Sequence, residues 1–96
     1  MDLNKLLKEK RQAVMALAAG YGAKNVRVFG SVVRAEARSD SDIDLLVKME
    51  EGQSLLDLSA LVCDLRDLLG VKVDVVSEDG LYWLLRRRIL NEARPL

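Results

Sequence analysis

The sequence has little of three features, and each shortage excludes a class of protein. It contains one cysteine, Cys63, so no internal disulfide can form and a reducing cytoplasm is the expected compartment. Lysine plus arginine (15) equals aspartate plus glutamate (15), so no overall positive field attracts nucleic acid, and we expect no direct binding to it. The apolar runs are a few residues long, far short of the roughly 20 that span a bilayer. The first residues also lack the apolar stretch of a signal peptide.

The composition that remains is typical of one small folded domain. Of the 96 residues, 50% are hydrophobic and 31% are charged, which is enough apolar area for one core. We therefore expect residues 1–96 to form a single domain. Any phosphate or metal binding should come from a local site rather than from overall charge.

Hydrophobic spacing predicts alternating helices and strands. Helices are predicted over about 3–19, 53–69 and 80–92, with one or two further helical turns at 31–36. Strands are predicted at 26–29, 42–47 and 71–76. Ser54 is a plausible N-cap of the middle helix, Gly70 its stop, and Pro95 follows the last helix. This order predicts an α/β fold of two layers, in which a small mixed sheet is backed by helices.

Two aspartates on the second predicted strand indicate a metal site. Asp42 and Asp44 are two residues apart and therefore project from one face, while Ile43 points toward the helices. Mg²⁺ prefers carboxylate and phosphate oxygens, and such a pair can hold two ions about 3.5–4 Å apart. Asp74 lies on the polar face of the third strand, and all three carboxylates converge if that strand lies beside the second. Solvated strand residues are the alternative, but three like charges on one face repel one another and favour a cation.

The end of the first predicted strand has the features of a phosphate-binding turn. Backbone N–H groups at Gly30-Ser31 can surround phosphate oxygens, and the Ser31 hydroxyl adds a donor. Arg34 follows one helical turn later and can direct its guanidinium to the same phosphates, with Arg38 as a weaker candidate. An ordinary turn and a surface ion pair are the alternative interpretations. Donors and metal ions together would hold a triphosphate for transfer with pyrophosphate leaving.

The spacing of these motifs resembles a known enzyme signature. Gly30-Ser31, ten intervening residues and then Asp42-Ile43-Asp44 resemble the signature of the DNA polymerase beta-like nucleotidyltransferase superfamily. The fuller strings at 29–34 and 41–47 resemble its minimal nucleotidyltransferase (MNT) branch in particular.

This resemblance implies the roles of the site residues and a partner. Asp42 and Asp44 would bind metal, Asp74 would complete the triad, and Gly30-Ser31 would contact the triphosphate. It also implies the nucleotidyltransferase fold, Mg²⁺ as cofactor and ATP as substrate. MNT proteins commonly pair with a HEPN-domain toxin, which the MNT protein adenylylates as its antitoxin.

Three functions remain open at this level. The first is nucleotidyl transfer to a partner protein, the second is a binding module that neutralises a partner by contact, and the third is transfer to a small molecule or an RNA end. The intact triad disfavours the second, and the small size, which leaves no residues for a second substrate pocket, favours a protein acceptor. Tyr82 and Trp83 are candidate docking residues, with core packing as the alternative. The acceptor, the preferred base, the oligomeric state and a role of Asp74 as base are not decided.

Overall fold

The chain folds around one four-stranded sheet. The computed structural model describes residues 3–30, 32, 42–80 and 83–96, so the predicted helical turns at 31–36 fall almost wholly outside the described residues. In chain order the elements are α1 (Leu3–Gly20), β1 (Ala23–Phe29), β2 (Ile43–Met49), α2 (Leu55–Leu69), β3 (Val73–Ser77), the 3-10 turn η1 (Glu78–Gly80), α3 (Trp83–Glu92) and β4 (Arg94–Pro95).

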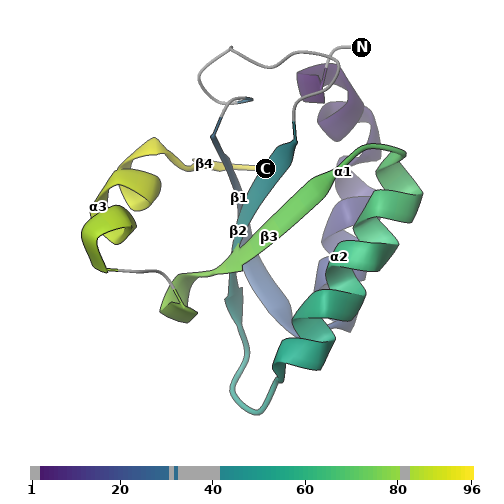
Figure 1. The fold of residues 1–96 in the computed structure, drawn as a ribbon. Helices are drawn as coiled ribbons and strands as arrows, with labels where there is room; N and C mark the ends of the chain where they lie inside the picture. Colours follow the sequence, from purple (N-terminus) through teal and green to yellow (C-terminus); the bar gives the residue numbers. More distant parts are fainter. Residues whose placement is uncertain (1–2, 31, 33–41, 81–82) are drawn as a thin grey trace.

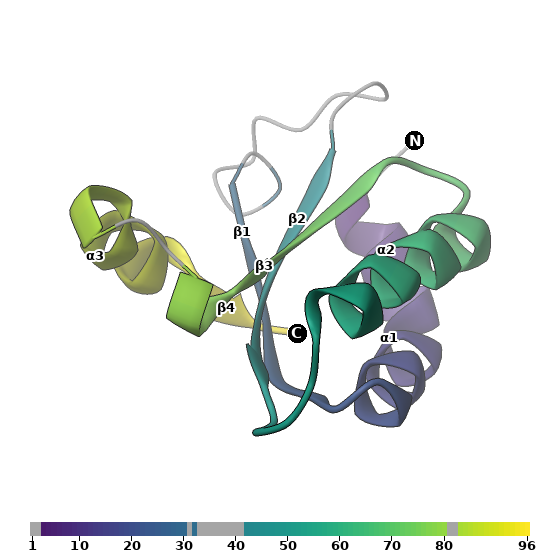
Figure 2. The same ribbon diagram turned by 60° about the horizontal axis from the view of Figure 1, so that its bottom comes forward.

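The sheet is mixed, and its strand order places helices on both faces. The order is β3-β2-β1-β4, in which β1 runs antiparallel to β2 and β4 while β2 and β3 are parallel. The helices α1 and α2 lie together over one face (Figure 1). Because β3 and β4 are opposite edges of the sheet, the chain between them crosses the other face, and α3 stands there, apart from α1 and α2 (Figure 2). The predicted α/β fold with a small mixed sheet backed by helices is confirmed.

The main core lies between the sheet and the α1–α2 layer. Ile43, Leu45 and Val47 of β2 are at most 1% exposed, because alternation along a strand turns every second side chain toward the helices. The helices supply the facing residues Leu3, Leu7, Val14 and Ala18 from α1 and Leu61, Leu65 and Leu69 from α2. The intervening positions of β2 therefore face the side of the sheet where α3 stands.

The face of the sheet away from α1 and α2 is partly covered by an ion pair between Arg27 and Glu78. Leu46 is fully buried although it lies outside the main core, and its cross-strand neighbours are Arg27 of β1 and Val76 of β3. Arg27 Nη2 donates to Glu78 Oε2 at 2.6 Å, and the two side chains are only 13% and 18% exposed. The pair thus links β1 to the end of β3 across the strand between them.

The α2 helix has the two ends that its sequence predicts. Ser54 is the N-cap and forms a capping box with Asp57, and Gly70 ends the helix in the left-handed conformation at φ 69°. The helix begins at Leu55 rather than at the predicted Gln53. Ser54 is its N-cap, and a cap residue precedes the first helical residue. In the described part of the chain, no helix is both long and apolar enough to cross a membrane.

Two differences from the sequence prediction concern β1 and its partner. β1 begins at Ala23 rather than at Val26, and its early part contains Asn25 at φ 52° and a register shift against β2 between Lys24 and Arg27. Such a bulge interrupts the alternation by which a strand is recognised in sequence. β4 was not predicted, because a strand of two residues that includes a proline carries no periodic pattern.

The Arg27–Glu78 pair should make a pH-dependent contribution to stability. The hydrogen bond from Arg27 holds the pKa of Glu78 below its usual 4.5, and desolvation by burial opposes this. Because the folded-state pKa is lowered, the contribution is complete above the unfolded-state pKa and is lost as pH falls through the folded-state pKa. We expect Glu78→Gln to lower the free energy of unfolding by about 1–3 kcal/mol at pH 7, measured by urea denaturation.

Glu51→Gln, in an exposed turn, is the matched control and should change the free energy of unfolding by less than about 0.5 kcal/mol. The deficit of Glu78→Gln should shrink between pH 7 and pH 3. A deficit that stays constant over this range would contradict the assignment.

Candidate functional site

The aspartates of the second strand lie on the face of the sheet away from α1 and α2. Asp44 is the second residue of β2, and Asp42 precedes the strand by one residue. Both are half-buried, whereas Ile43 and Leu45 are buried in the main core. Alternation along β2 therefore places Asp44 on the second face, and Asp42, just before the strand, is expected to share that face.

The third strand brings another carboxylate beside them. β3 runs parallel to β2, with Ile43 in register with Val73 and Asp44 in register with Asp74. Residues in register on neighbouring strands lie on the same face, and neighbouring strands are about 4.8 Å apart. The two strands are thus neighbours, as expected, and Asp74 lies next to Asp44 near the same end of both strands.

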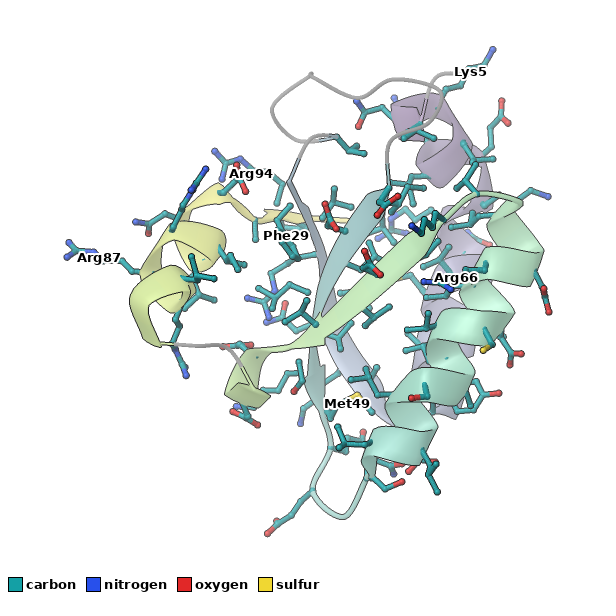
Figure 3. All side chains as sticks on the ribbon, viewed as in Figure 1. Lys5, Phe29, Met49, Arg66, Arg87 and Arg94 are labelled. Atoms are coloured by element: carbon teal, nitrogen blue, oxygen red, sulfur yellow. The ribbon has the colours of Figure 1, made fainter. Side chains whose placement is uncertain are left out.

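Asp74 is paired with an arginine that the sequence analysis did not single out. Arg66 Nη2 lies 3.5 Å from Asp74 Oδ1, and Arg66 Nε donates to the main-chain oxygen of Val73 at 3.0 Å. Figure 3 shows Arg66 between α2 and β3. The two paired side chains are 44% and 51% exposed, so the ion pair is weak and open to exchange. The sequence did contain a signal for Arg66. It lies in the last turn of α2, where a positive charge interacts favourably with the helix dipole.

Gly30 and Asp44 are in close contact across the ends of β1 and β2. Phe29, the last residue of β1, pairs with Asp44 and lies on the α3 side of the sheet (Figure 3). Gly30 follows at φ 80°, and a Cβ atom on it would lie 2.3 Å from Asp44 Oδ2. No side chain fits in that space, so the site requires glycine at this position for both its conformation and its contact.

A carboxylate from the distant α3 also reaches this turn. The Gly30 N–H donates to Glu92 Oε2 at 3.1 Å. Glu92 was not singled out from the sequence, because nothing in its local pattern connects the end of one helix with a turn 62 residues earlier. The predicted phosphate contacts Ser31, Arg34 and Arg38, and the docking candidate Tyr82, lie outside the described residues, as does the side chain of Trp83.

The described carboxylates suit a magnesium ion that shares its coordination with a substrate. Among the described residues, no three acidic, histidine or cysteine side chains are close enough to enclose an ion, so the expected convergence of all three aspartates is not present in this arrangement. Asp74 pairs with Arg66 instead. Mg²⁺ is commonly held by one or two carboxylates together with substrate phosphates, and Asp42 with Asp44 supply such a pair.

A separate cavity does not contain the acidic residues. It has a volume of about 700 Å³ and lies between α1, β1 and β4. Its described lining is Asn4, Leu7, Lys8, Arg11, Val28, Val32, Arg94, Pro95 and Leu96. Asp42, Asp44 and Asp74 are not among the described residues that line this cavity.

Comparison with known proteins assigns the chain to a family. The family described as "Nucleotidyltransferase domain" matches residues 5–96. The chain belongs to this nucleotidyltransferase family. The resemblance carried by the Gly30-Ser31 and Asp42-Ile43-Asp44 motifs is therefore confirmed.

Two curated relatives of this nucleotidyltransferase carry the name protein adenylyltransferase. One, provisionally so named, comes from Methanocaldococcus jannaschii and is 41% identical over 87 residues, covering 91% of this chain and 94% of the relative. The other is the protein adenylyltransferase MntA of Thermococcus cleftensis, 43% identical over 72 residues, covering 75% of this chain and 73% of the relative.

Solved structures confirm the nucleotidyltransferase fold. One, provisionally described as a minimal nucleotidyltransferase, superimposes with a TM-score of 0.88 at 57% identity and covers 100% of this chain and 97% of its own. Another is an MNT antitoxin in complex with the tri-AMPylated HEPN toxin of Shewanella oneidensis, with a TM-score of 0.71 at 17% identity, covering 92% of this chain and 69% of its own. The second likeness concerns the fold alone.

The contact between Gly30 and Asp44 predicts a costly glycine substitution. Gly30→Ala should lower the free energy of unfolding by about 2–4 kcal/mol, because it combines a strained positive φ with overpacking against Asp44 Oδ2. Gly70→Ala is the matched control, since Gly70 also has a positive φ but open space at its Cβ position, and it should cost about 1–2 kcal/mol. Urea denaturation measures both.

The part of the stability loss that comes from overpacking against Asp44 should disappear when the Asp44 carboxylate is removed. In an Asp44→Ala background, Gly30→Ala should cost no more than Gly70→Ala does. Equal costs of Gly30→Ala with and without Asp44 would show that the carboxylate does not occupy this space.

Proposed function

We propose that the chain is a Mg²⁺-dependent nucleotidyltransferase that transfers AMP from ATP to a hydroxyl group of a partner protein. The observation that carries this proposal is the position of Asp44, which lies against Gly30 on one side and in register with Asp74 on the other. A carboxylate pair beside a glycine turn is the arrangement that brings cations and phosphates together. The names of the two adenylyltransferase relatives support AMP as the transferred group.

Each site residue has a proposed role in this reaction. Asp42 and Asp44 hold Mg²⁺, two ions in the full site, and Asp74 completes the set by exchanging Arg66 for a cation. The bound cations neutralise the charge that develops on the phosphates. Ser31 and Arg34 hold the triphosphate by its oxygens, and Gly30, whose N–H is bonded to Glu92, lets the phosphates approach the turn because it has no side chain.

The transfer step exchanges a phosphoanhydride bond of ATP for a phosphoester bond to the acceptor. The acceptor oxygen forms a bond to the α-phosphorus, the bond from that phosphorus to the bridging oxygen of the β-phosphate breaks, and pyrophosphate leaves with the bond electrons. The hydroxyl proton must leave the acceptor, and Asp74 is the candidate base because its carboxylate is half exposed at the edge of the site. Catalysis of this kind depends on positioning the reactants in line.

The proposed acceptor is a HEPN-type toxin, with this chain as its antitoxin. The MNT–HEPN complex that shares the fold contains an AMPylated toxin, and this supports a similar pair here. We place the reaction in the cytoplasm, in keeping with the single cysteine.

The metal-binding role of the carboxylates can be separated from a structural role. Asp42→Asn and Asp44→Asn should each reduce AMP transfer by at least about 100-fold, because each removes a ligand worth several kcal/mol in the transition state. Their melting temperatures should stay within a few degrees of wild type, as expected for changes that keep side-chain volume. Asp67→Asn, an exposed position on α2, is the matched control and should leave both quantities unchanged. An unfolded Asp44→Asn variant would show that the carboxylate is structural.

The acceptor class is tested by intact-mass measurement. The protein is incubated with ATP and Mg²⁺ and with the product of the neighbouring gene, then in parallel with small alcohols, aminoglycosides and short RNAs. We expect the neighbouring protein to gain the mass of one or more AMP groups, with no gain when EDTA replaces Mg²⁺. AMP on an RNA or a small molecule, with the neighbouring protein unmodified, would replace the protein acceptor by the third function. Binding of the neighbour without any transfer would favour the non-catalytic module.

A further inference from the structure

The last residue of α3 contacts the turn on which the triphosphate is proposed to bind. Glu92 Oε2 accepts the Gly30 N–H at 3.1 Å, and Glu92 is half-buried. Gly30 is therefore restricted on two sides. Asp44 fills the space where a side chain of Gly30 would stand, and Glu92 binds its main-chain nitrogen.

The pairing of β4 explains why Glu92 reaches this place. Arg94 of β4 pairs with Val28 of β1 in antiparallel register. Gly30 lies two residues after Val28, just beyond the end of β1. Glu92 lies two residues before Arg94, just ahead of β4. The antiparallel ladder would continue there, but Glu92 belongs to α3, so its side-chain carboxylate takes the place of a main-chain acceptor.

The end of α3 is itself held firmly. Arg94 Nη1 donates to the main-chain oxygens of Asn91, Glu92 and Ala93 at 3.1–3.3 Å, which satisfies carbonyl groups left open at the helix end. The Leu96 N–H donates to the Val26 oxygen at 3.2 Å and continues the attachment to β1. The main chain around Glu92 is thus held by these hydrogen bonds, and its carboxylate is held by the Gly30 N–H.

A glycine turn has a special need for such an anchor. Glycine visits many backbone conformations, so a turn that contains it keeps one shape only where its neighbours hold it. A phosphate-binding turn must present its N–H groups in a fixed direction, because donors that are already oriented cost no reorganisation when the ligand binds. The contact with Asp44 restricts the space around Gly30, whereas the bond to Glu92 fixes its main-chain nitrogen.

We infer that Glu92 is a positioning residue of the nucleotide site, which holds the Gly30 turn in the conformation that binds the triphosphate. The inference rests on the proposed function and adds a residue from α3 to that site. The opposite arrangement, in which Glu92 occupies a donor that a phosphate needs, makes a contrary prediction. Removal of Glu92 would then strengthen nucleotide binding.

Three substitutions at this position separate the hydrogen bond from the charge. Glu92→Ala removes the acceptor, Glu92→Asp keeps the charge but shortens the reach, and Glu92→Gln keeps an oxygen acceptor at the same reach without the charge. Calorimetry with a non-hydrolysable ATP analogue and Mg²⁺ should show about tenfold weaker binding for the Ala and Asp variants. The Gln variant should stay within about threefold of wild type. Asn91→Ala, the exposed neighbour on α3, is the control and should bind as wild type does.

Two further measurements exclude a merely structural role. In AMP transfer, the Ala and Asp variants should raise KM for ATP about tenfold with kcat within about twofold, as expected for lost binding rather than lost chemistry. In the absence of nucleotide, amide hydrogen exchange at Gly30 should be about tenfold faster in these two variants than in wild type and Glu92→Gln.

The outcomes distinguish this inference from the proposed function. A wild-type protein that binds no nucleotide would overturn the proposed function, while hydrogen exchange would still report on the Gly30–Glu92 bond. Wild-type binding together with equal or tighter binding by Glu92→Ala would overturn the inference alone. Weak binding by Glu92→Gln with normal binding by Glu92→Asp would show that charge acts rather than the hydrogen bond. If Glu92→Ala fails to fold, the Asp and Gln variants decide.

Discussion

The contact between Gly30 and Asp44 is the constraint on which the rest of the site depends. Asp44 is held by its place in β2, between two residues that are buried in the core, and it fills the space above Gly30. Asp44, the proposed metal ligand, and the proposed phosphate-binding turn at Gly30 are therefore positioned by the same β1–β2 ladder. β3 then adds Asp74 in register with Asp44, so the proposed cation ligands lie side by side on neighbouring strands.

The proposed cation site is a local concentration of negative charge in a chain whose net charge is zero. Asp42, Asp44 and Asp74 lie on one side of the sheet, and among the described residues Arg66 is the cation that pairs with Asp74. Because this pair is about half exposed, water and salt screen it and its dissociation costs little. The Arg27–Glu78 pair is much less exposed and stabilises the same face of the sheet. One ion pair thus supports the fold, and the other is open to replacement by metal.

The sequence predicted those parts of the fold that have a local pattern. The alternation along β2 identified both the buried Ile43 side and the acidic Asp44 side, and Ser54 and Gly70 marked the ends of α2 because capping depends on residue type. β4 and the contact of Glu92 with Gly30 were missed, since both arise from tertiary pairing between distant segments. The pairing of Asp74 with Arg66 was also missed, although the position of Arg66 in the last turn of α2 was a signal for it. Ser31 and Arg34 stay predictions, because they lie outside the described residues.

We propose that a divalent cation and a triphosphate bind together on the sheet face between Gly30 and Asp74. Paramagnetic broadening by Mn²⁺, added with a non-hydrolysable ATP analogue to isotope-labelled protein, tests this claim most directly by NMR. We expect selective loss of the amide signals of Gly30, Asp44 and Asp74, with those of Leu55 and Leu56 at the start of α2 retained. Selective loss around Lys8 and Arg11 in the cavity beside α1, or no selective loss at any residue, would contradict it.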